Sequence, residues 1–336
     1  MVNKIKNQKV AILPKFLQKN DTVALVATAK KLDVSIVENA RKHLENCGLQ
    51  VIVGESATAS FHQFSGDDHV RTKDFQTQLN NPNVKAIICL RGGYGSVRII
   101  DHLDFSEFVK HPKWIVGYSD VTVIQNHVLK NYNIASLHAE MPLNYPPHVP
   151  LAQTSRSDEG GYPPLARTCS PCQNDSLEAL KNALFGTFDP FQLQPNPLNK
   201  IGSTKAELVG GNLAILCNLL GSVSEVDTTG KILFLEDIGE YLYAIDRMMM
   251  TLKRAGKLEK LAGLTIGQFT NLQDNEIPFG KTAYEIIAEH TAEYNYPVMF
   301  DIPAGHSEIN KTLVFGGTYT LDVSKNSAAL TFELKN

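Results

Sequence analysis

The sequence has 336 residues, of which 43% are hydrophobic and 20% charged, and its formal net charge is −3. These values are typical of an ordinary globular protein long enough for two domains, and they give no reason to expect nucleic acid as a partner. Residues 1–17 lack the apolar run of a signal peptide, and no stretch approaches the roughly 20 apolar residues that span a bilayer. We therefore expect a cytoplasmic protein with no membrane partner.

Between residues 21 and 138, apolar runs typical of strands alternate with segments that have helical spacing. This alternation indicates βαβ units and predicts an N-terminal domain with a Rossmann-like, mostly parallel sheet and flanking helices. Ligands of such sheets bind at the carboxyl ends of the strands. The predicted strands are 21–28, 49–53, 84–90 and 114–117, and the predicted helices are 34–46, 70–79, 97–103, 105–109 and 121–129; the pattern changes after 134–138.

The sequence pattern of the second half of the chain predicts another α/β domain, which follows a long connecting segment. Residues 142–172 hold seven prolines and show no periodicity, which is typical of a lid or an inter-domain loop. We expect an N-terminal domain over 1–141, a connection with one helix (175–184) over 142–204, and a mixed α/β domain over 205–336. In this last domain the predicted strands are 206–209, 231–235, 263–269, 297–300, 317–323 and 328–333, the predicted helices are 212–220, 243–255 and 281–290, and Gly210-Gly211 is a predicted turn.

The five cysteines include one C-x-x-C pair, Cys169 and Cys172, in a polar stretch. A zinc site would need a second pair nearby, and none is present. We expect no metal or cofactor, and the sequence leaves open whether these two cysteines ever pair.

One stretch predicts a sharp strand-to-helix turn. The apolar strand 114–117 ends at Gly117, Ser119 and Asp120 follow, and a helical pattern starts at once. Such an elbow lifts a serine side chain out of the backbone at a helix N-terminus, where negative charge is favoured. The elbow alone equally fits two residues that merely cap the helix.

Two other polar residues follow apolar strands. Glu236 comes directly after the strand 231–235, and His306 follows Pro303-Ala304-Gly305 on a turn of small residues that would expose its imidazole. An activated serine needs a base to take its proton and an acid to orient that base. Ser119, Glu236 and His306 are therefore candidates for nucleophile, acid and base.

An oxyanion hole needs two N–H donors. One candidate is the N–H of Asp120, and the other is an N–H of the Gly92-Gly93 turn, where the missing side chains allow close backbone approach. The same loop is a poor phosphate site because it lacks both the G-x-G-x-x-G spacing and a following Lys-Ser/Thr.

Taken together, these residues resemble the LD-carboxypeptidases, the serine peptidases of the muramoyl-tetrapeptide carboxypeptidase and microcin-immunity family. The resemblance covers about residues 17–323. It is carried by the motifs Arg91-Gly-Gly-Tyr-Gly95, Gly117-Tyr-Ser-Asp120, Leu137-His138, Gly210-Gly-Asn-Leu213, Leu235-Glu-Asp237, Tyr243-Ala-Ile-Asp-Arg247 and Ile302-Pro-Ala-Gly-His306.

The resemblance implies a cytoplasmic serine carboxypeptidase, often a homodimer, with Ser119, Glu236 and His306 as its triad and Glu240 as the second choice for the acid. It implies a muropeptide substrate that loses a terminal D-alanine from its tetrapeptide during cell-wall recycling, and an active site between the two domains. Candidates for contact with the substrate are Arg91, Tyr94, Arg247 and Lys311.

The chain departs from the family pattern at His138-Ala-Glu-Met141, where members usually read His-Gly-Pro-Met, and around 151–173, which is rich in Ser and Pro. The elbow lacks the final glycine of G-x-S-x-G, which argues against a standard α/β-hydrolase. Three alternatives stay open: a microcin-immunity hydrolase of peptidyl-aminoacyl-nucleotides, an esterase, and a non-catalytic protein that binds a small peptide or sugar. The first is disfavoured because the single tryptophan, Trp114, lies in the elbow strand and offers no platform for a base.

Overall fold

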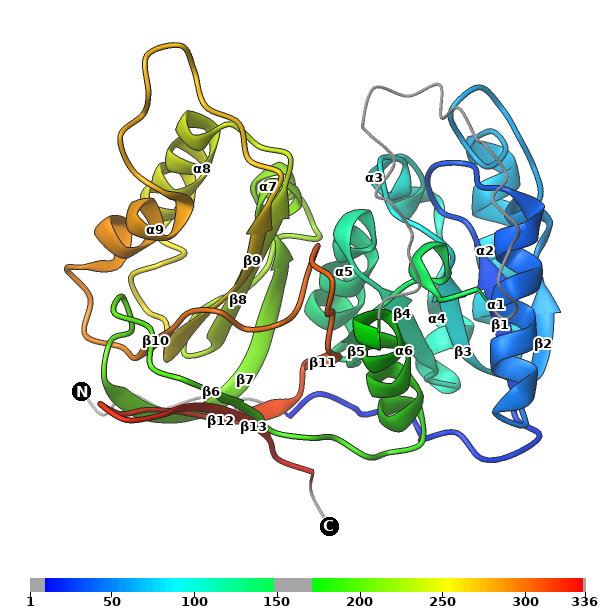
Figure 1. Cartoon of the computed structure of the whole chain (residues 1–336). Helices are drawn as coiled ribbons and strands as arrows, with labels where there is room; N and C mark the ends of the chain where they lie inside the picture. The colour runs from blue at the N-terminus through cyan, green and yellow to red at the C-terminus, as the bar shows by residue number, and fades with distance from the viewer. Residues whose placement is uncertain (1–9, 148–170, 335–336) are drawn as a thin grey trace, which may run out of the picture.

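The computed structural model describes residues 10–147 and 171–334, with no side-chain description for 171–174. Two β-sheets lie side by side with helices around them, and α5 and β11 lie between the two halves (Figure 1). The predicted class, two α/β domains of which the second is mixed, is confirmed. Residues 148–170 of the predicted connection, Cys169 included, lie outside the described residues.

The first sheet has the strand order β11-β5-β4-β3-β1-β2. Its five N-terminal strands are parallel, as predicted, whereas β11 comes from the second half of the chain and pairs antiparallel with β5. The bounds are β1 Thr22–Val26, β2 Gln50–Val53, β3 Val84–Cys89, β4 Trp114–Gly117, β5 Ser136–His138 and β11 Leu313–Phe315.

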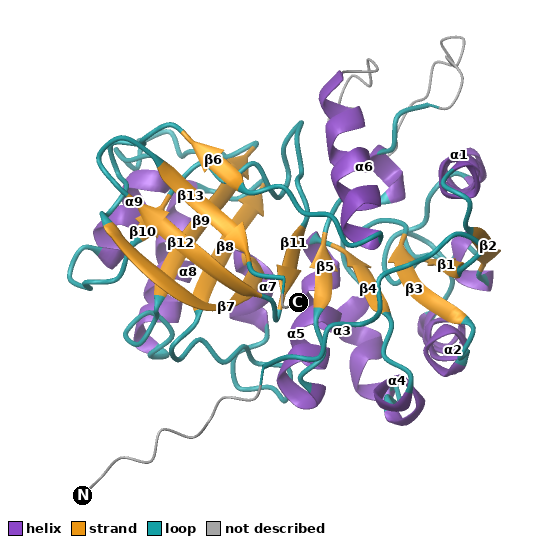
Figure 2. Cartoon of the chain, turned by 90° about the horizontal axis from the view of Figure 1, so that it is seen from below, coloured by secondary structure: helices purple, strands orange, loops and turns teal. Residues whose placement is uncertain are grey.

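Helices cover both faces of this sheet, which explains why its strands are continuous apolar runs. On β1, Val23 and Leu25 join the buried cluster that includes α1 and α6, while Ala24 and Val26 join the cluster on the other face. Figure 2 shows α1 and α6 on one side of the sheet and α2, α4 and α5 on the other. The bounds are α1 Val34–Asn46, α2 Asp68–Asn80, α3 Ser96–Ile99, α4 Ser106–Lys110, α5 Thr122–Tyr132 and α6 Pro171–Leu184, with single 3-10 turns at Glu55–Ala57, Ile100–His102, Ser119–Val121 and Pro142–Asn144.

The second sheet has the order β10-β9-β8-β7-β12-β13-β6 and mixes parallel with antiparallel pairs. Its helix α9 begins with a capping box, in which the side chains of Thr282 and Glu285 each bond the other's backbone N–H. The bounds are β6 Phe191–Leu193, β7 Gly202–Asn212, β8 Ile232–Ile238, β9 Gly263–Thr270, β10 Val298–Met299, β12 Thr318–Val323, β13 Ala328–Phe332, α7 Leu213–Asn218, α8 Leu242–Arg254 and α9 Ala283–Thr291.

Two predictions about this domain are wrong. The predicted Gly210-Gly211 turn lies inside β7, because these glycines serve close approach rather than reversal of the chain. A Cβ at Gly210 would lie 2.0 Å from the carbonyl oxygen of Phe234, and one at Gly211 would lie 2.6 Å from Thr122 Oγ1. The predicted strand 231–235 continues to Ile238, so Glu236 lies within β8 and not after it.

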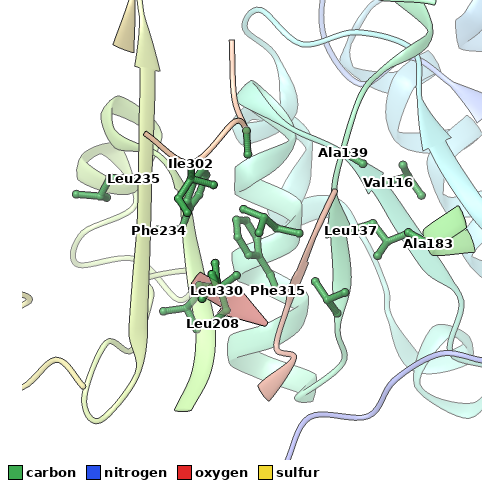
Figure 3. Close-up of a cluster of buried hydrophobic side chains, with 14 of the residues drawn as sticks. Val116, Leu137, Ala139, Ala183, Leu208, Phe234, Leu235, Ile302, Phe315 and Leu330 are labelled. Atoms are coloured by element: carbon green, nitrogen blue, oxygen red, sulfur yellow. The ribbon is translucent and has the colours of Figure 1, made fainter. Parts of the chain in front are cut away.

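The two halves share one buried apolar cluster. Val116 and Leu137 of the first sheet and Phe234 of β8 belong to it, and Phe315 of β11 lies between them (Figure 3). Hydrogen bonds also cross the junction, because Asn126 Nδ2 on α5 donates to the Gly210 carbonyl over 3.0 Å. The shared cluster and this hydrogen bond therefore hold the two domains in one relative orientation. A site that takes residues from both domains depends on that orientation.

Candidate active site

Ser119 occupies a strained elbow at the carboxyl end of β4. Its φ of 61° lies in the left-handed region, which a side chain other than glycine adopts at a cost of about 1–3 kcal/mol. Gly117 precedes it with a φ of 154°, and a Cβ there would lie 2.9 Å from Val121 Cγ2. Strain of this kind is characteristic of nucleophile turns.

The structure decides against the capping alternative for this turn. The N-cap of α5 is Val121, which makes no side-chain cap bond. Asp120 instead turns its buried carboxylate to the neighbouring loop, where Oδ2 accepts the N–H of Ser96 over 2.8 Å. Burial raises the pKa of Asp120.

The glycine loop after β3 lies against the serine. A Cβ at Gly92 would lie 2.9 Å from both Cβ and Oγ of Ser119 and 3.4 Å from the backbone N of Asp120. A side chain at this position would therefore displace the serine. At Gly93, with a φ of 116°, the space that a Cβ would take is filled by the aliphatic stem of Lys30.

A buried arginine fixes the same loop from behind. Arg71, which is wholly buried, donates from Nη1 to the carbonyl oxygens of Thr28 at 2.6 Å and Gly95 at 3.0 Å. The sequence places Arg71 on a helix and gives no sign of this role, because burial of an arginine is decided by tertiary packing.

His306 and Glu236 form a short ion pair from two neighbouring elements. His306 Nδ1 lies 2.6 Å from Glu236 Oε2, and the backbone N–H of His306 bonds the same oxygen over 3.3 Å. Glu236 is wholly buried, and the imidazole is 14% exposed, less than the sequence predicted. Of the two candidate acids, the carboxylate that contacts the histidine is thus Glu236 and not Glu240.

The loop that carries His306 is held at several points. A Cβ at Gly305 would lie 2.7 Å from Glu236 Oε2, so glycine is required for this approach. The Gly305 N–H donates to Asn310 Oδ1 over 2.9 Å, and the N–H of Asn310 donates to Ser176 Oγ of α6 over 2.8 Å. Thr270 Oγ1 donates to the His306 carbonyl over 2.6 Å.

The two partners shift each other's titration in opposite directions. Burial acts to raise the pKa of Glu236, but the charge and hydrogen bond of His306 lower it below its ordinary value. Burial acts to lower the pKa of His306, but Glu236 raises it above its ordinary value. The pair therefore favours a carboxylate beside an imidazole that readily accepts a proton.

The two domains meet at this pair. The ring of Tyr118, the residue before Ser119, lies with its centroid 4.8 Å from that of His306. Ser119 comes from the first sheet, and Glu236 and His306 come from the second half of the chain, so the site lies where the halves join.

Of the predicted substrate contacts, Arg91 and Tyr94 lie in the glycine loop. Arg91 Nη1 donates to the Lys31 carbonyl over 2.8 Å, and Tyr94 is 46% exposed. Lys311 follows the His306 loop and donates its backbone N–H to Pro303. Arg247 lies on α8 with its guanidinium 5.4 Å above the Tyr243 ring, and within the described residues no contact links it to the triad candidates.

Sequence reasoning missed three buried polar residues around the pair. His138 is wholly buried between Tyr118, Phe234 and Phe315, and burial lowers its pKa to about 4. Burial raises the pKa of Asp237 and of Glu140, each to about 7. His138 and Asp237 stand in motifs quoted above and Glu140 stands at a departure from the family pattern, but none of these signals indicated burial.

Within residues 10–147 and 171–334, no group of three or more His, Cys, Asp or Glu side chains is placed to hold a metal ion. No helix in this described part of the chain is both long and apolar enough to cross a membrane.

The two α/β domains, with the candidate serine, histidine and carboxylate where they join, are the arrangement expected of a serine-type hydrolase. The profile of the LD-carboxypeptidase N-terminal domain matches residues 23–139, and that of the C-terminal domain matches residues 205–321. A probable murein peptide carboxypeptidase of Bacillus subtilis is 30% identical over 317 residues, which is 94% of this chain and 93% of the relative. The chain therefore belongs to the LD-carboxypeptidase family, the serine-type carboxypeptidases that the sequence analysis indicated.

Solved structures agree with this assignment. The crystal structure of a muramoyltetrapeptide carboxypeptidase from Oxalobacter formigenes superposes with a TM-score of 0.77 at 25% identity and covers 93% of this chain and 99% of its own. The microcin C7 self-immunity protein MccF has a TM-score of 0.80 at 17% identity over 97% of this chain and 100% of its own, and this likeness shows the fold alone.

Proposed function

We propose that this protein removes the C-terminal D-alanine from the tetrapeptide of muropeptides, acting on an amide between an L-configured centre and a D-amino acid. The contact between His306 and Glu236, beside the strained Ser119, is the observation that supports this proposal most directly. The names of the Bacillus and Oxalobacter relatives support the substrate class.

In the proposed mechanism, Ser119 Oγ attacks the scissile carbonyl carbon while His306 takes its proton. Glu236 holds the imidazole through Nδ1 and stabilises the imidazolium that forms. His306 then gives the proton to the departing amine of D-alanine. An acyl-enzyme remains on Ser119, and water hydrolyses it with His306 again acting as base.

The oxyanion of each tetrahedral intermediate would be held by backbone N–H groups of Asp120 and of the Gly92-Gly93 turn. Gly92 lies directly against Ser119 and close to the Asp120 N, which supports this role. One such donor typically contributes about 3 kcal/mol of transition-state stabilisation.

Three further points belong to the same proposal. Arg91, Tyr94, Arg247 and Lys311 remain candidates for substrate contact, and of these Arg91 and Tyr94 are the best supported because they lie beside Gly92. The domain boundaries remain those proposed from the sequence. A cytoplasmic location and a homodimer are part of the proposal, and light scattering on the purified protein tests the dimer.

The decisive experiment is incubation of the protein, and of Ser119→Ala, with purified L-Ala-D-Glu-diamino-acid-D-Ala, followed by mass spectrometry. We expect loss of one alanine with the native protein only. Loss with both proteins would exclude Ser119 as the nucleophile. No loss with either, together with turnover of a peptidyl-aminoacyl-nucleotide, would favour the immunity-type alternative.

A further inference from the structure

A second buried carboxyl group, Glu140, lies close to the catalytic pair and has no part in the mechanism above. It belongs to the turn after β5 and is only 4% exposed. Its Oε1 accepts the N–H of Met141 over 3.0 Å and the side-chain amide of Asn144 over 2.9 Å. Burying a carboxyl group costs free energy. We therefore ask what Glu140 contributes to the site besides packing.

The contacts of Glu140 lead to His306 through one aromatic ring. Asn144 Nδ2, which donates to Glu140 Oε1, also donates to Tyr118 Oη over 3.1 Å, so this amide links the two side chains. Tyr118 is 4% exposed, and its ring lies with its centroid 4.8 Å from that of His306 at an interplanar angle of 57°. The phenol is thus linked to Glu140 through Asn144 while its ring flanks the imidazole.

Glu140 also acts on His306 through charge. Glu236 from β8 and Tyr118 from the turn after β4 contact the imidazole, and the other titratable groups that act on its charge are Asp237 from β8, His138 from β5 and Glu140 from the turn after β5. Glu236, Asp237 and Glu140, when ionised, each raise the pKa of His306. Of these only Glu236 bonds the imidazole directly.

We propose that Glu140 is a positioning residue for His306, which it serves in two ways. Through Asn144 it holds Tyr118 against the imidazole ring, and its carboxylate, when ionised, adds negative charge near the imidazolium that forms when Ser119 loses its proton. This inference rests on the proposed function for its peptide assay, whereas its labelling assay needs no peptide substrate.

The main variant is Glu140→Gln, which keeps the shape of the side chain and removes the charge. We expect kcat on the tetrapeptide to fall roughly tenfold with KM within about twofold of native, because the change acts on the protonated histidine and not on binding. We also expect the pH at which kcat/KM falls on the acidic side to be lower in the variant, because His306 loses a nearby negative charge that favours its protonated form. Tyr118→Phe keeps the ring and the charge of Glu140, and should lower kcat without changing this pH.

A matched control separates positioning from simple destabilisation. Asp74 is also 4% exposed, and its carboxylate accepts the N–H of Ser56 over 2.8 Å in the first domain. Asp74→Asn should lower thermal stability and leave the pH profile unchanged. A Glu140→Gln profile that coincides with the native profile would overturn the proposal.

A second readout keeps the inference independent of the substrate. The rate at which a fluorophosphonate probe labels Ser119 depends on proton transfer to His306 and needs no peptide. Its acidic limb should shift in Glu140→Gln as in the kinetic assay. If the native protein is labelled but leaves the tetrapeptide intact, the proposed substrate fails while the labelling shift still supports the role of Glu140. Labelling curves of native and Glu140→Gln that superpose would overturn that role.

Discussion

His306 Nδ1 lies 2.6 Å from Glu236 Oε2, and the backbone N–H of the same histidine bonds the same oxygen. One carboxylate oxygen thus fixes both the ring and the main chain of His306. Because Nδ1 is engaged, the ring is held in the tautomer that leaves Nε2 for a proton from serine.

The first prediction concerns this contact. In Glu236→Gln the amide holds no negative charge, so the imidazolium loses its stabilisation, and we expect kcat/KM to fall about 10⁴-fold, as in other triads that lose their carboxylate. Because Glu236 raises the pKa of His306, the acidic limb of any residual activity should move to lower pH. Steady-state kinetics across pH measure both effects. Glu240→Gln is the control and should retain activity within about twofold, since it does not contact His306; the reverse ranking of the two variants would reassign the acid.

The second prediction follows from the backbone of Ser119. Its φ of 61° strains any residue with a Cβ, whereas glycine adopts this region freely. Both Ser119→Ala and Ser119→Gly should lose turnover, but Ser119→Gly should unfold with a free energy about 1 kcal/mol higher than Ser119→Ala. Urea unfolding followed by circular dichroism measures the difference. Equal stability of the two variants would mean that the elbow is not strained.

The third prediction tests the approach of the glycine loop to the serine. Gly92 is not among the glycines with a positive φ, so alanine adds no left-handed strain there, but its Cβ would come within 2.9 Å of Ser119 Oγ. We expect Gly92→Ala to fold and to lose about 10²–10³-fold in kcat, the size of effect seen when an oxyanion donor is removed. Gly221, with a φ of 79° and nothing within 4 Å of a Cβ, offers the control. Gly221→Ala should cost stability and leave kcat unchanged.

Much of the fold was predictable because local signals and tertiary structure agree. The strands of the first sheet are buried on both faces and read as apolar runs, and α1 begins and ends at the residues that helical spacing indicated, 34 and 46. Ser119, Glu236 and His306 stood out because each follows or ends an apolar strand, and the structure brings Glu236 and His306 into contact.

The missed features depend on contacts between residues far apart in the chain. β11 pairs with β5 across more than 170 residues of sequence, and three apolar residues give no such signal. Gly210 and Gly211 read as a turn, although they are glycines because Phe234 and Thr122 lie so close. Nor does any local pattern distinguish a buried Glu140 from a solvated one, since burial of a polar side chain is a property of the assembled fold.

The fourth prediction concerns Asp237 and the pH dependence of stability. Asp237 Oδ2 accepts the N–H of Ala214 at the start of α7 over 2.9 Å, and Oδ1 accepts Asn212 Nδ2 over 2.8 Å. Burial, followed by the charge of Glu236, raises the pKa of Asp237 from 3.8 to about 7. The folded state therefore holds this proton more tightly than the unfolded state. The stability that results is fully present below the unfolded pKa and is lost as pH rises through the folded one.

Between pH 5 and pH 8 this group should cost the native protein on the order of 3 kcal/mol of unfolding free energy. Asp237→Asn removes this titrating group. The free energy of unfolding of the variant should therefore rise relative to that of the native protein as pH increases. Urea unfolding of both proteins at pH 5, 6, 7 and 8 measures that difference, and all other titrating groups cancel from it. Asp322→Asn, on the exposed side of β12, is the control and should follow the native curve. Parallel curves for native and Asp237→Asn would mean that Asp237 is already ionised at pH 5 in the folded protein.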